Sequence, residues 1–206
     1  MNFTNTKVYN FEGAFRGMRN PKNSWDKSDS VWGDTLEDTV IGIKDLELAQ
    51  RLIKAGTEHA KFLRQIFVSV DINAPLYWWK EADQYRVGAV TNSTSTMHTL
   101  ANNPITAECF EHDAMDRLNI TDTIVNLCEG LRQVYIDTHS TEVWRGLIQL
   151  LPESWLQLRT WTGNYAMLRN IYLQRQNHKL REWSVDFMVW VNTLPYAKEL
   201  ITYGTY

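Results

Sequence analysis

The chain has 206 residues, and its 44% hydrophobic and 12% aromatic content is enough to bury one core, so we expect a single domain over residues 1–206. The 21 lysines and arginines against 24 aspartates and glutamates give a formal charge of −3, which provides no overall attraction to nucleic acid. No apolar run approaches the roughly 20 residues that a membrane span needs, so no membrane partner is expected.

The cysteines and histidines argue against a disulfide scaffold and a metal site. Cys109 and Cys128 lie in unrelated contexts, and the five histidines are scattered without an HExxH pair. The start MNFTNTKVYN has no basic segment followed by an apolar one, so we expect a cytoplasmic location. Nine tryptophans suit interfaces or ligand pockets, which leaves oligomerisation open.

The first part of the chain combines an irregular start with periodic segments. Residues 1 to about 40 mix Gly, Asn, Ser and Asp with isolated aromatics, which is typical of an irregular arm around the domain or a neighbouring subunit. Asp45 is placed to cap a helix that Gly56 ends. Gln65–Ile72 alternates β-branched residues with a mixed set and predicts a strand, after which Pro75 starts a helix.

The remainder is mostly helical in pattern. Val90–Thr99 is rich in hydroxyl groups and predicts neither a strong helix, a buried strand nor a tight turn; such a segment can present hydrogen-bonding groups to a ligand. Apolar spacing predicts helices over Ile120–Asp137 with an Asn119 cap, from Ser140 to about Leu151, and from Asn164 to about Leu194. We therefore expect an α+β fold, helix-rich, with a small central antiparallel or mixed sheet.

Neither glycine-rich phosphate-binding motif occurs, so a phosphate must be held by side chains and helix ends. Two blocks of sequence carry the chemistry instead. In the first, Ala74-Pro75-Leu76 leads into Trp79–Arg86, and Asn92–Met97 follows. The second block contains Leu151-Pro152, Trp161–Asn164, Asn170, Arg175 and His178–Glu182.

These blocks resemble the motifs of the flavin-dependent thymidylate synthases. In that family an A-P-I strand end leads into A-R-Q-W-x-R-H-R and then S-x-N-E-x-S-x-R, and W-T-x-N-x-R-x-x-x-N follows later in the chain. The spacing from Pro152 through Asn164 and Asn170 to Arg175 matches without a gap. The resemblance covers roughly residues 45 to 100 and 140 to 200.

The resemblance implies reductive methylation of dUMP at C5, with methylenetetrahydrofolate as carbon donor and FAD carrying a hydride from NADPH. It also implies a homotetramer whose sites are built from several subunits. Family members lack the cysteine nucleophile of the folate-only synthases, which fits two cysteines that lie outside both blocks. The ligand is then dUMP or another pyrimidine nucleotide.

Carried over residue by residue, the family pattern assigns roles to ten side chains. Arg175 resembles the arginine near the nucleotide and Ser95 the motif serine beside it, so these two are the candidate catalytic residues. The candidate FAD-binding residues are Tyr85, Arg86, Asn164 and Asn170. The candidate substrate-binding residues are Lys80, Glu81, Ser93, Ser95, Arg145 and Arg175. The alternative for each is an ordinary turn, cap or surface role.

Several motif positions depart from the family. Its R-H-R is Gln84-Tyr85-Arg86 here, which removes positive charge that favours the FAD pyrophosphate, although Tyr85 can stack and Arg86 can still pair with it. The motif Glu is Ser93 and the motif Arg is Met97. Arg16 and Arg19 of the N-terminal arm can compensate.

Three functions follow from these departures. The first is a divergent synthase acting on dUMP, and the second is a related flavoenzyme modifying another deoxypyrimidine nucleotide. The third is a non-catalytic nucleotide-binding or assembly protein on the same fold.

Overall fold

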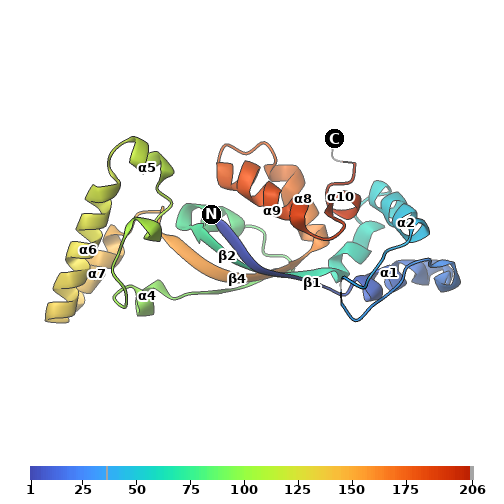
Figure 1. Ribbon diagram of the computed structural model, residues 1–206, viewed down its shortest axis with the longest axis horizontal. Helices are drawn as coiled ribbons and strands as arrows, with labels where there is room; N and C mark the ends of the chain where they lie inside the picture. Colours follow the sequence, from blue (N-terminus) through green and yellow to red (C-terminus); the bar gives the residue numbers. More distant parts are fainter. Residues whose placement is uncertain (36, 205–206) are drawn as a thin grey trace. The chain divides into compact units, whose positions relative to one another are not determined.

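The computed structural model describes residues 1–35 and 37–204, and an antiparallel four-stranded sheet runs through it (Figure 1). The strands are β1 (Asn2–Tyr9), β2 (Phe67–Pro75), β3 (Val90–Ser93) and β4 (Leu156–Asn164), in the order β1-β2-β4-β3. The α-helices are α1 (Phe11–Arg19), α2 (Ile43–Lys54), α3 (Leu76–Ala82), α4 (Thr96–Thr99), α5 (Asp113–Arg117), α6 (Thr121–Thr138), α7 (Thr141–Leu150), α8 (Tyr165–Arg175), α9 (Met188–Thr193) and α10 (Ala197–Leu200). Short 3-10 helices lie at Asn20–Lys22, Trp25–Lys27, Ala60–Gln65 and Ala107–Cys109, and a π-helix, η5, spans Glu182–Phe187. The helix-rich α+β expectation is confirmed.

The inner strand β2 shows the alternation that its sequence predicts. Val68, Val70 and Ile72 are buried and their neighbours are less so, because successive side chains of a strand point to opposite faces. The strand runs on to Pro75, whose extended backbone precedes the first residue of α3. The edge strand β3 is exposed at every position, which is common where one side of a strand lacks a neighbour.

The predicted irregular arm is wrong for its first half. The residues Asn2–Tyr9 form an edge strand and Phe11–Arg19 form α1. The strand was missed because its pairing depends on backbone groups, while its side chains are mostly polar and exposed. Between α1 and α2 the described residues form short 3-10 turns and an isolated bridge between Val31 and Val40, which agrees with the expectation of irregular structure there.

Two further local predictions need correction. Asp45 does not cap α2; the helix begins at Ile43, and Asp45 is a buried residue of its first turn. Asn119 has a left-handed backbone and precedes Ile120, the residue that flanks α6, so it does not cap that helix. Val90–Thr99 was expected to form neither a strong helix nor a buried strand, and it forms the exposed strand β3 and the four-residue helix α4.

The described chain groups into two compact units. Unit 1 comprises Met1–Asn2, Asp71–Gln84 and Thr91–Thr160. Its helices α6 and α7 lie side by side, in yellow and orange (Figure 1). Five buried residues form its main apolar cluster: Leu100, Ile105, Phe110, Cys128 and Leu147. Ser140 caps α7 by accepting a hydrogen bond from the Val143 amide, as its sequence predicts.

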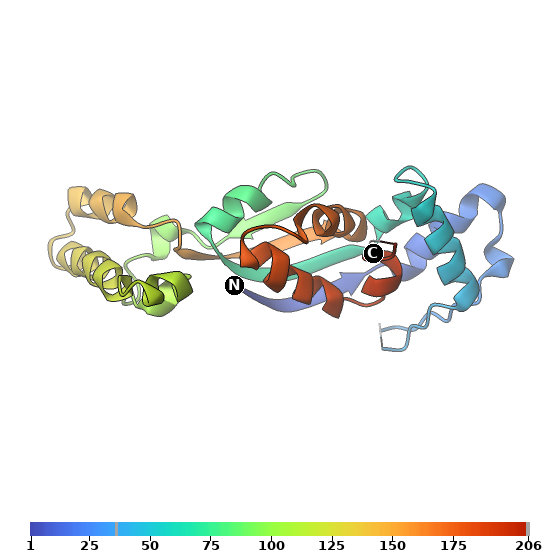
Figure 2. The same cartoon turned by 90° about the horizontal axis from the view of Figure 1, so that it is seen from above.

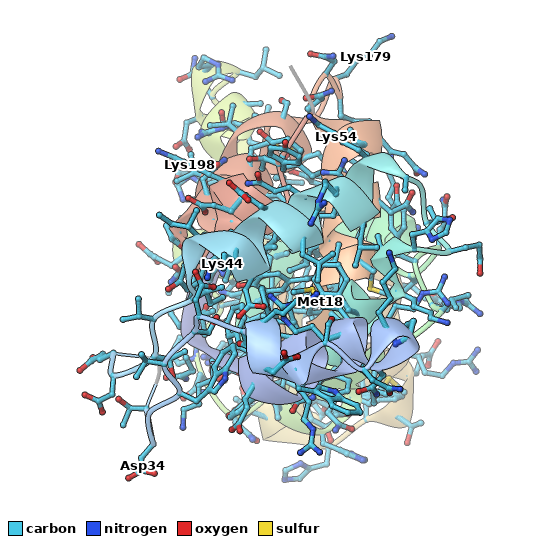
Figure 3. The ribbon with its side chains drawn as sticks, turned by 90° about the vertical axis from the view of Figure 1, so that its right-hand side faces the viewer. Met18, Asp34, Lys44, Lys54, Lys179 and Lys198 are labelled. Atoms are coloured by element: carbon cyan, nitrogen blue, oxygen red, sulfur yellow. The ribbon has the colours of Figure 1, made fainter. Side chains whose placement is uncertain are left out.

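Unit 2 comprises Phe3–Val70, Tyr85–Val90 and the chain from Trp161 onward. Its helices α1 and α2, in blue and cyan, are neighbours (Figure 2). The core of this unit is aromatic: the Phe11 ring meets the Tyr165 ring edge-on at 5.6 Å between centroids. Met18 of α1 lies in the interior, whereas Lys44 and Lys54 extend from α2 (Figure 3). The single-domain expectation stays a prediction.

Within residues 1–35 and 37–204, the helices are all too short or too polar to cross a bilayer.

Candidate functional site

Unit 2 brings together residues from both motif blocks. Nε of Arg175, at the end of α8, donates to the Tyr85 hydroxyl at 2.8 Å. That hydroxyl donates in turn to Oε1 of Gln174 at 2.9 Å, and the Gln174 amide donates to Oδ1 of Asn170 at 3.0 Å. Because a phenol can both donate and accept, Tyr85 links these side chains into one hydrogen-bonded chain, defined here as the Tyr85 network.

Aromatic rings hold the guanidinium of the Tyr85 network. The guanidinium carbon of Arg175 lies 5.4 Å from the Tyr85 ring centroid and 5.1 Å from that of Trp183. Contacts of this kind attract a cation to the negative face of a ring. Trp183 was not predicted as a site residue, and it belongs to the π-helix η5, a form of helix that often occurs at functional sites.

Asn164 lies where β4 ends and α8 begins. Its Oδ1 accepts a hydrogen bond from the Met167 amide at 3.0 Å, so the side chain caps α8. Its Nδ2 lies 3.1 Å from where a side chain at Gly88 would begin, which places the loop after Tyr85 against this amide. The predicted FAD-binding residues Tyr85, Asn164 and Asn170 therefore all lie on one pair of segments, and Arg86 is an exposed residue of the first.

The remaining predicted residues belong to unit 1. Lys80 of α3 is 69% exposed and pairs with Glu153, and the next residue, Glu81, is half-buried. Ser93 is exposed at the end of β3, and the carbonyl of Ser95 accepts a hydrogen bond from the Thr99 hydroxyl.

Arg145 is exposed on α7. The Asn92–Met97 segment contains four consecutive hydroxyl residues, from Ser93 to Thr96, and the last of them begins α4.

Arg159 of β4 is a second residue that sequence reasoning missed. Its guanidinium lies 4.3 Å from the Trp79 ring centroid and donates to the Asp83 carboxylate at 2.9 Å. Its Nε donates to Gln157, whose amide donates to the Thr94 carbonyl at 3.0 Å. This arginine therefore ties α3 and the segment before Ser95 to the same strand.

Burial affects the pKa of two groups outside the Tyr85 network. It raises the pKa of the Cys128 thiol, which keeps this residue uncharged and unsuited to nucleophilic attack. It also raises the pKa of the Tyr165 hydroxyl, which donates to the Pro195 carbonyl at 2.6 Å. Among the residues that the structure describes, no three His, Cys, Asp or Glu side chains gather to hold a metal ion.

Comparison with known proteins identifies the fold. The chain is similar to a crystal structure of the flavin-dependent thymidylate synthase ThyX from Helicobacter pylori complexed with FAD and dUMP, with a TM-score of 0.73, 18% sequence identity and 98% of both chains covered. A second structure of that enzyme with FAD and dUMP gives a TM-score of 0.73 and 18% identity over 98% of this chain and 97% of the other. No protein-family model matches the sequence, and no curated protein matches it significantly. The chain thus has the fold of the flavin-dependent thymidylate synthases.

Proposed function

We propose that the chain is a flavin-dependent thymidylate synthase-like enzyme that methylates dUMP at C5. Methylenetetrahydrofolate supplies the carbon, and NADPH supplies the hydride. The fold supports this proposal, because the similar structures are complexes with FAD and dUMP. The observation that carries it is the Tyr85 network, which joins Tyr85 of the first motif block to Asn170 and Arg175 of the second across 90 residues of chain.

The side chains of this region fit a flavin. Asn164 and Asn170 can donate and accept at the edge of a planar ring, and Tyr85 can stack on its face. Arg86 supplies positive charge for a pyrophosphate, with less of it than the family's R-H-R offers. FAD would supply the hydride chemistry, and these residues would bind it and orient its ring.

The residues proposed to bind the nucleotide are Lys80, Glu81, Ser93, Ser95, Arg145 and Arg175. Ser93 and Ser95 offer hydroxyl donors to a phosphate or base, and Lys80 offers an ammonium group. The Lys80 pair with Glu153 is exposed, so a phosphate can replace that carboxylate at little cost. Glu81 and Arg145 complete the proposed set. The proposal includes a cytoplasmic homotetramer, and free Cys109 and Cys128 suit a reducing compartment.

A second candidate is a flavoenzyme that modifies another deoxypyrimidine nucleotide. The observation in its favour is Met97, which is exposed where the family has an arginine. Loss of that cation changes the charge available to the nucleotide, and the change need not affect the flavin chemistry.

The deciding experiment is the visible absorption spectrum of the purified protein with and without added FAD and dUMP, followed by NADPH and then methylenetetrahydrofolate without oxygen. We expect a flavin spectrum that bleaches with NADPH. Tyr85→Phe keeps the ring and removes the hydroxyl, so FAD affinity should fall about tenfold. Tyr9→Phe, at an exposed tyrosine of β1, is the control and should leave affinity unchanged.

Each outcome separates the candidates. Bleaching with product formed from dUMP supports the synthase, and bleaching with product formed only from another deoxypyrimidine nucleotide supports the second candidate. Nucleotide binding without any retained flavin contradicts both enzyme functions and favours a binding or assembly protein.

A further inference from the structure

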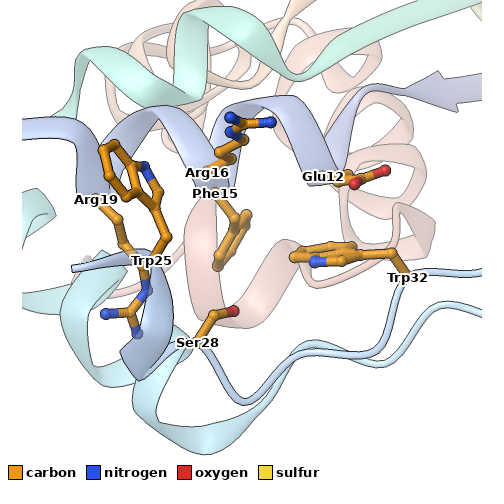
Figure 4. Close-up of a pocket in the computed structure, with 7 residues that line it drawn as sticks. All are labelled: Glu12, Phe15, Arg16, Arg19, Trp25, Ser28 and Trp32. Carbon is orange, nitrogen blue, oxygen red and sulfur yellow. The ribbon is translucent and has the colours of Figure 1, made fainter. Parts of the chain in front are cut away.

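A cavity of about 280 Å³ opens beside α1 in unit 2. Its lining comes from α1 and from the segment that follows it, before residue 33 (Figure 4). None of the lining residues belongs to the Tyr85 network or to the proposed nucleotide residues. The cavity is therefore a separate feature that the proposed function does not use.

Arg19, which lines this cavity, forms a buried ion pair with Asp45. Nε of Arg19 donates to Asp45 at 2.6 Å, and its two terminal nitrogens donate to the carbonyls of Ser24 and Lys27. Ser28 also donates to the Asp45 carboxylate, at 2.6 Å. The polar groups of Arg19 and Ser28 thus hold the segment after α1 in place, and the charge of Arg19 is offset by Asp45.

The walls of the cavity are aromatic. Phe15 lies between Trp25 and Trp32 (Figure 4), with 5.9 Å between the Phe15 and Trp32 ring centroids. The Trp25 indole is fixed by a 2.8 Å hydrogen bond to Asn20, yet 46% of this residue is exposed. A fixed and partly exposed indole offers a flat face to a ligand, and aromatic faces stack well on nucleobases. The volume suits one heterocycle with little beyond it.

Two opposite charges complete the lining. Glu12 and Arg16 lie one turn apart on α1, and neither has an ion-pair partner among the described residues. Their charges balance, so a ligand that is neutral and has both donors and acceptors fits best. A quaternary ammonium ion would be repelled by the positive charge of Arg16, and a phosphate would be repelled by the negative charge of Glu12.

We propose that this cavity binds a guanine-type base. A carboxylate accepts from two adjacent donors, and guanine presents its ring N–H beside an amino group on one edge. A guanidinium donates to two adjacent acceptors, which guanine presents as O6 and N7 on another edge. Glu12 and Arg16 supply the acceptor and donor groups that these edges require, and Trp25 and Trp32 supply aromatic faces, with the buried Phe15 ring packed against Trp32. Adenine and cytosine place an acceptor beside their amino group and would oppose the carboxylate.

Calorimetric titration of the full chain with guanosine, inosine, adenosine and cytidine tests this site. Inosine lacks only the 2-amino group, so guanosine should bind about tenfold more tightly than inosine, and the other two nucleosides more weakly still. Glu12→Gln should remove the preference for guanosine over inosine. Glu47→Gln removes the same charge at an exposed position of α2 and should preserve the preference for guanosine over inosine.

A second pair of variants tests the other edge. Arg16→Gln should weaken guanosine binding about tenfold, whereas Arg51→Gln on α2 should not. The proposal is overturned by an absence of saturable guanosine binding, by equal affinity for all four nucleosides, or by choline competing with guanosine. None of these outcomes depends on flavin binding, so failure here leaves the proposed synthase function untouched.

Discussion

At the scale of single residues, Tyr85 holds the Arg175 side chain in two ways. Its hydroxyl accepts from Arg175, and its ring lies beside the same guanidinium. Trp183 adds a second ring, so the side chain is held before any ligand arrives. A guanidinium that is already ordered loses less conformational entropy on binding an anion.

Arg175→Ala should therefore weaken dUMP binding by roughly 1.5 to 3 kcal/mol, because a charge-assisted hydrogen bond to phosphate is lost. Isothermal titration calorimetry measures this directly. Arg181→Ala removes an exposed arginine that pairs with Asp186 and serves as the control. Equal affinities for Arg175→Ala and the unaltered protein would exclude Arg175 from the nucleotide site.

Asn164 has two separable tasks, one for each end of its amide. Asn164→Ala removes the α8 cap and should lower the free energy of unfolding by about 1 to 2 kcal/mol. Asn164→Asp retains a capping oxygen, so stability should stay close to that of the unaltered protein while the Nδ2 donor that we propose for the flavin is lost. Urea unfolding and FAD titration of both variants separate these effects. Normal FAD affinity of Asn164→Asp would restrict this residue to capping.

Asp45→Asn should destabilise the protein by roughly 3 to 5 kcal/mol, since it leaves the Arg19 charge buried without its partner. Asp45 is 0% exposed and Arg19 is 5% exposed, so water cannot replace the lost carboxylate. Urea unfolding gives the difference. Glu47→Gln on the same helix should change the free energy of unfolding by less than about 0.5 kcal/mol. A comparable small loss for Asp45→Asn would show that the pair is not a stabilising element.

At the scale of elements, sequence periodicity predicted the helices and strands whose formation depends on side-chain burial. The alternation of Val68, Val70 and Ile72 predicted β2, and Ser140 correctly marked the start of α7. The strands β1 and β4 escaped prediction because their residues alternate weakly in hydrophobicity, and strand pairing depends on backbone partners far away in the chain.

The same limit applies to the site. Motif register pointed to Tyr85 and Arg175, which meet across 90 residues of chain. It did not reveal Trp183, whose place on a π-helix no spacing rule predicts, or Arg159, which bonds Asp83 across 76 residues. It also offered Arg19 as a compensating cation, but Asp45 neutralises that side chain.

Helix α6 carries a pH-sensitive contact. The Arg132 guanidinium, with the Ile105 amide and Gln133, lowers the pKa of the Glu129 carboxyl to about 2. A depressed carboxyl pKa stabilises the fold above its unfolded pKa near 4.5, and this stability disappears as the pH falls toward 2. Its value at neutral pH is about 1 to 3 kcal/mol, since 25% of this side chain is exposed and solvent screens the pair.

Glu129→Gln should accordingly be less stable than the unaltered protein at pH 7, and the difference should shrink as the pH falls from about 4.5 toward 2. Urea unfolding at several pH values measures this slope. Glu142→Gln lies in the exposed first turn of α7, and its free energy of unfolding should change with pH in the same way as that of the unaltered protein. A difference that is constant from pH 7 to pH 2 would rule out Glu129 as the titrating group.

At the scale of the whole molecule, the fold persists although the sequence has changed. Similarity at a TM-score of 0.73 with 18% identity is possible because many apolar residues satisfy one burial pattern. A ligand site tolerates fewer replacements than a core does. The family's motif histidine, glutamate and arginine each make polar contacts that tyrosine, serine and methionine cannot reproduce. Under the proposed function, the departures from the family motifs at Tyr85, Ser93 and Met97 would therefore alter the ligand contacts first and the fold last.

The number of subunits in the assembly depends on the surface of the whole chain. We expect a homotetramer of about 96 kDa, four times the 24.1 kDa chain, and light scattering after size-exclusion chromatography measures it. Large apolar side chains such as Ile43, Leu127 and Val189 are exposed in the single chain, and subunit contacts would cover surface of this kind. Because apolar contacts are not screened by salt, the mass should be unchanged between low and high ionic strength. A mass near 24.1 kDa at every concentration would contradict the tetramer and require a complete site within one chain.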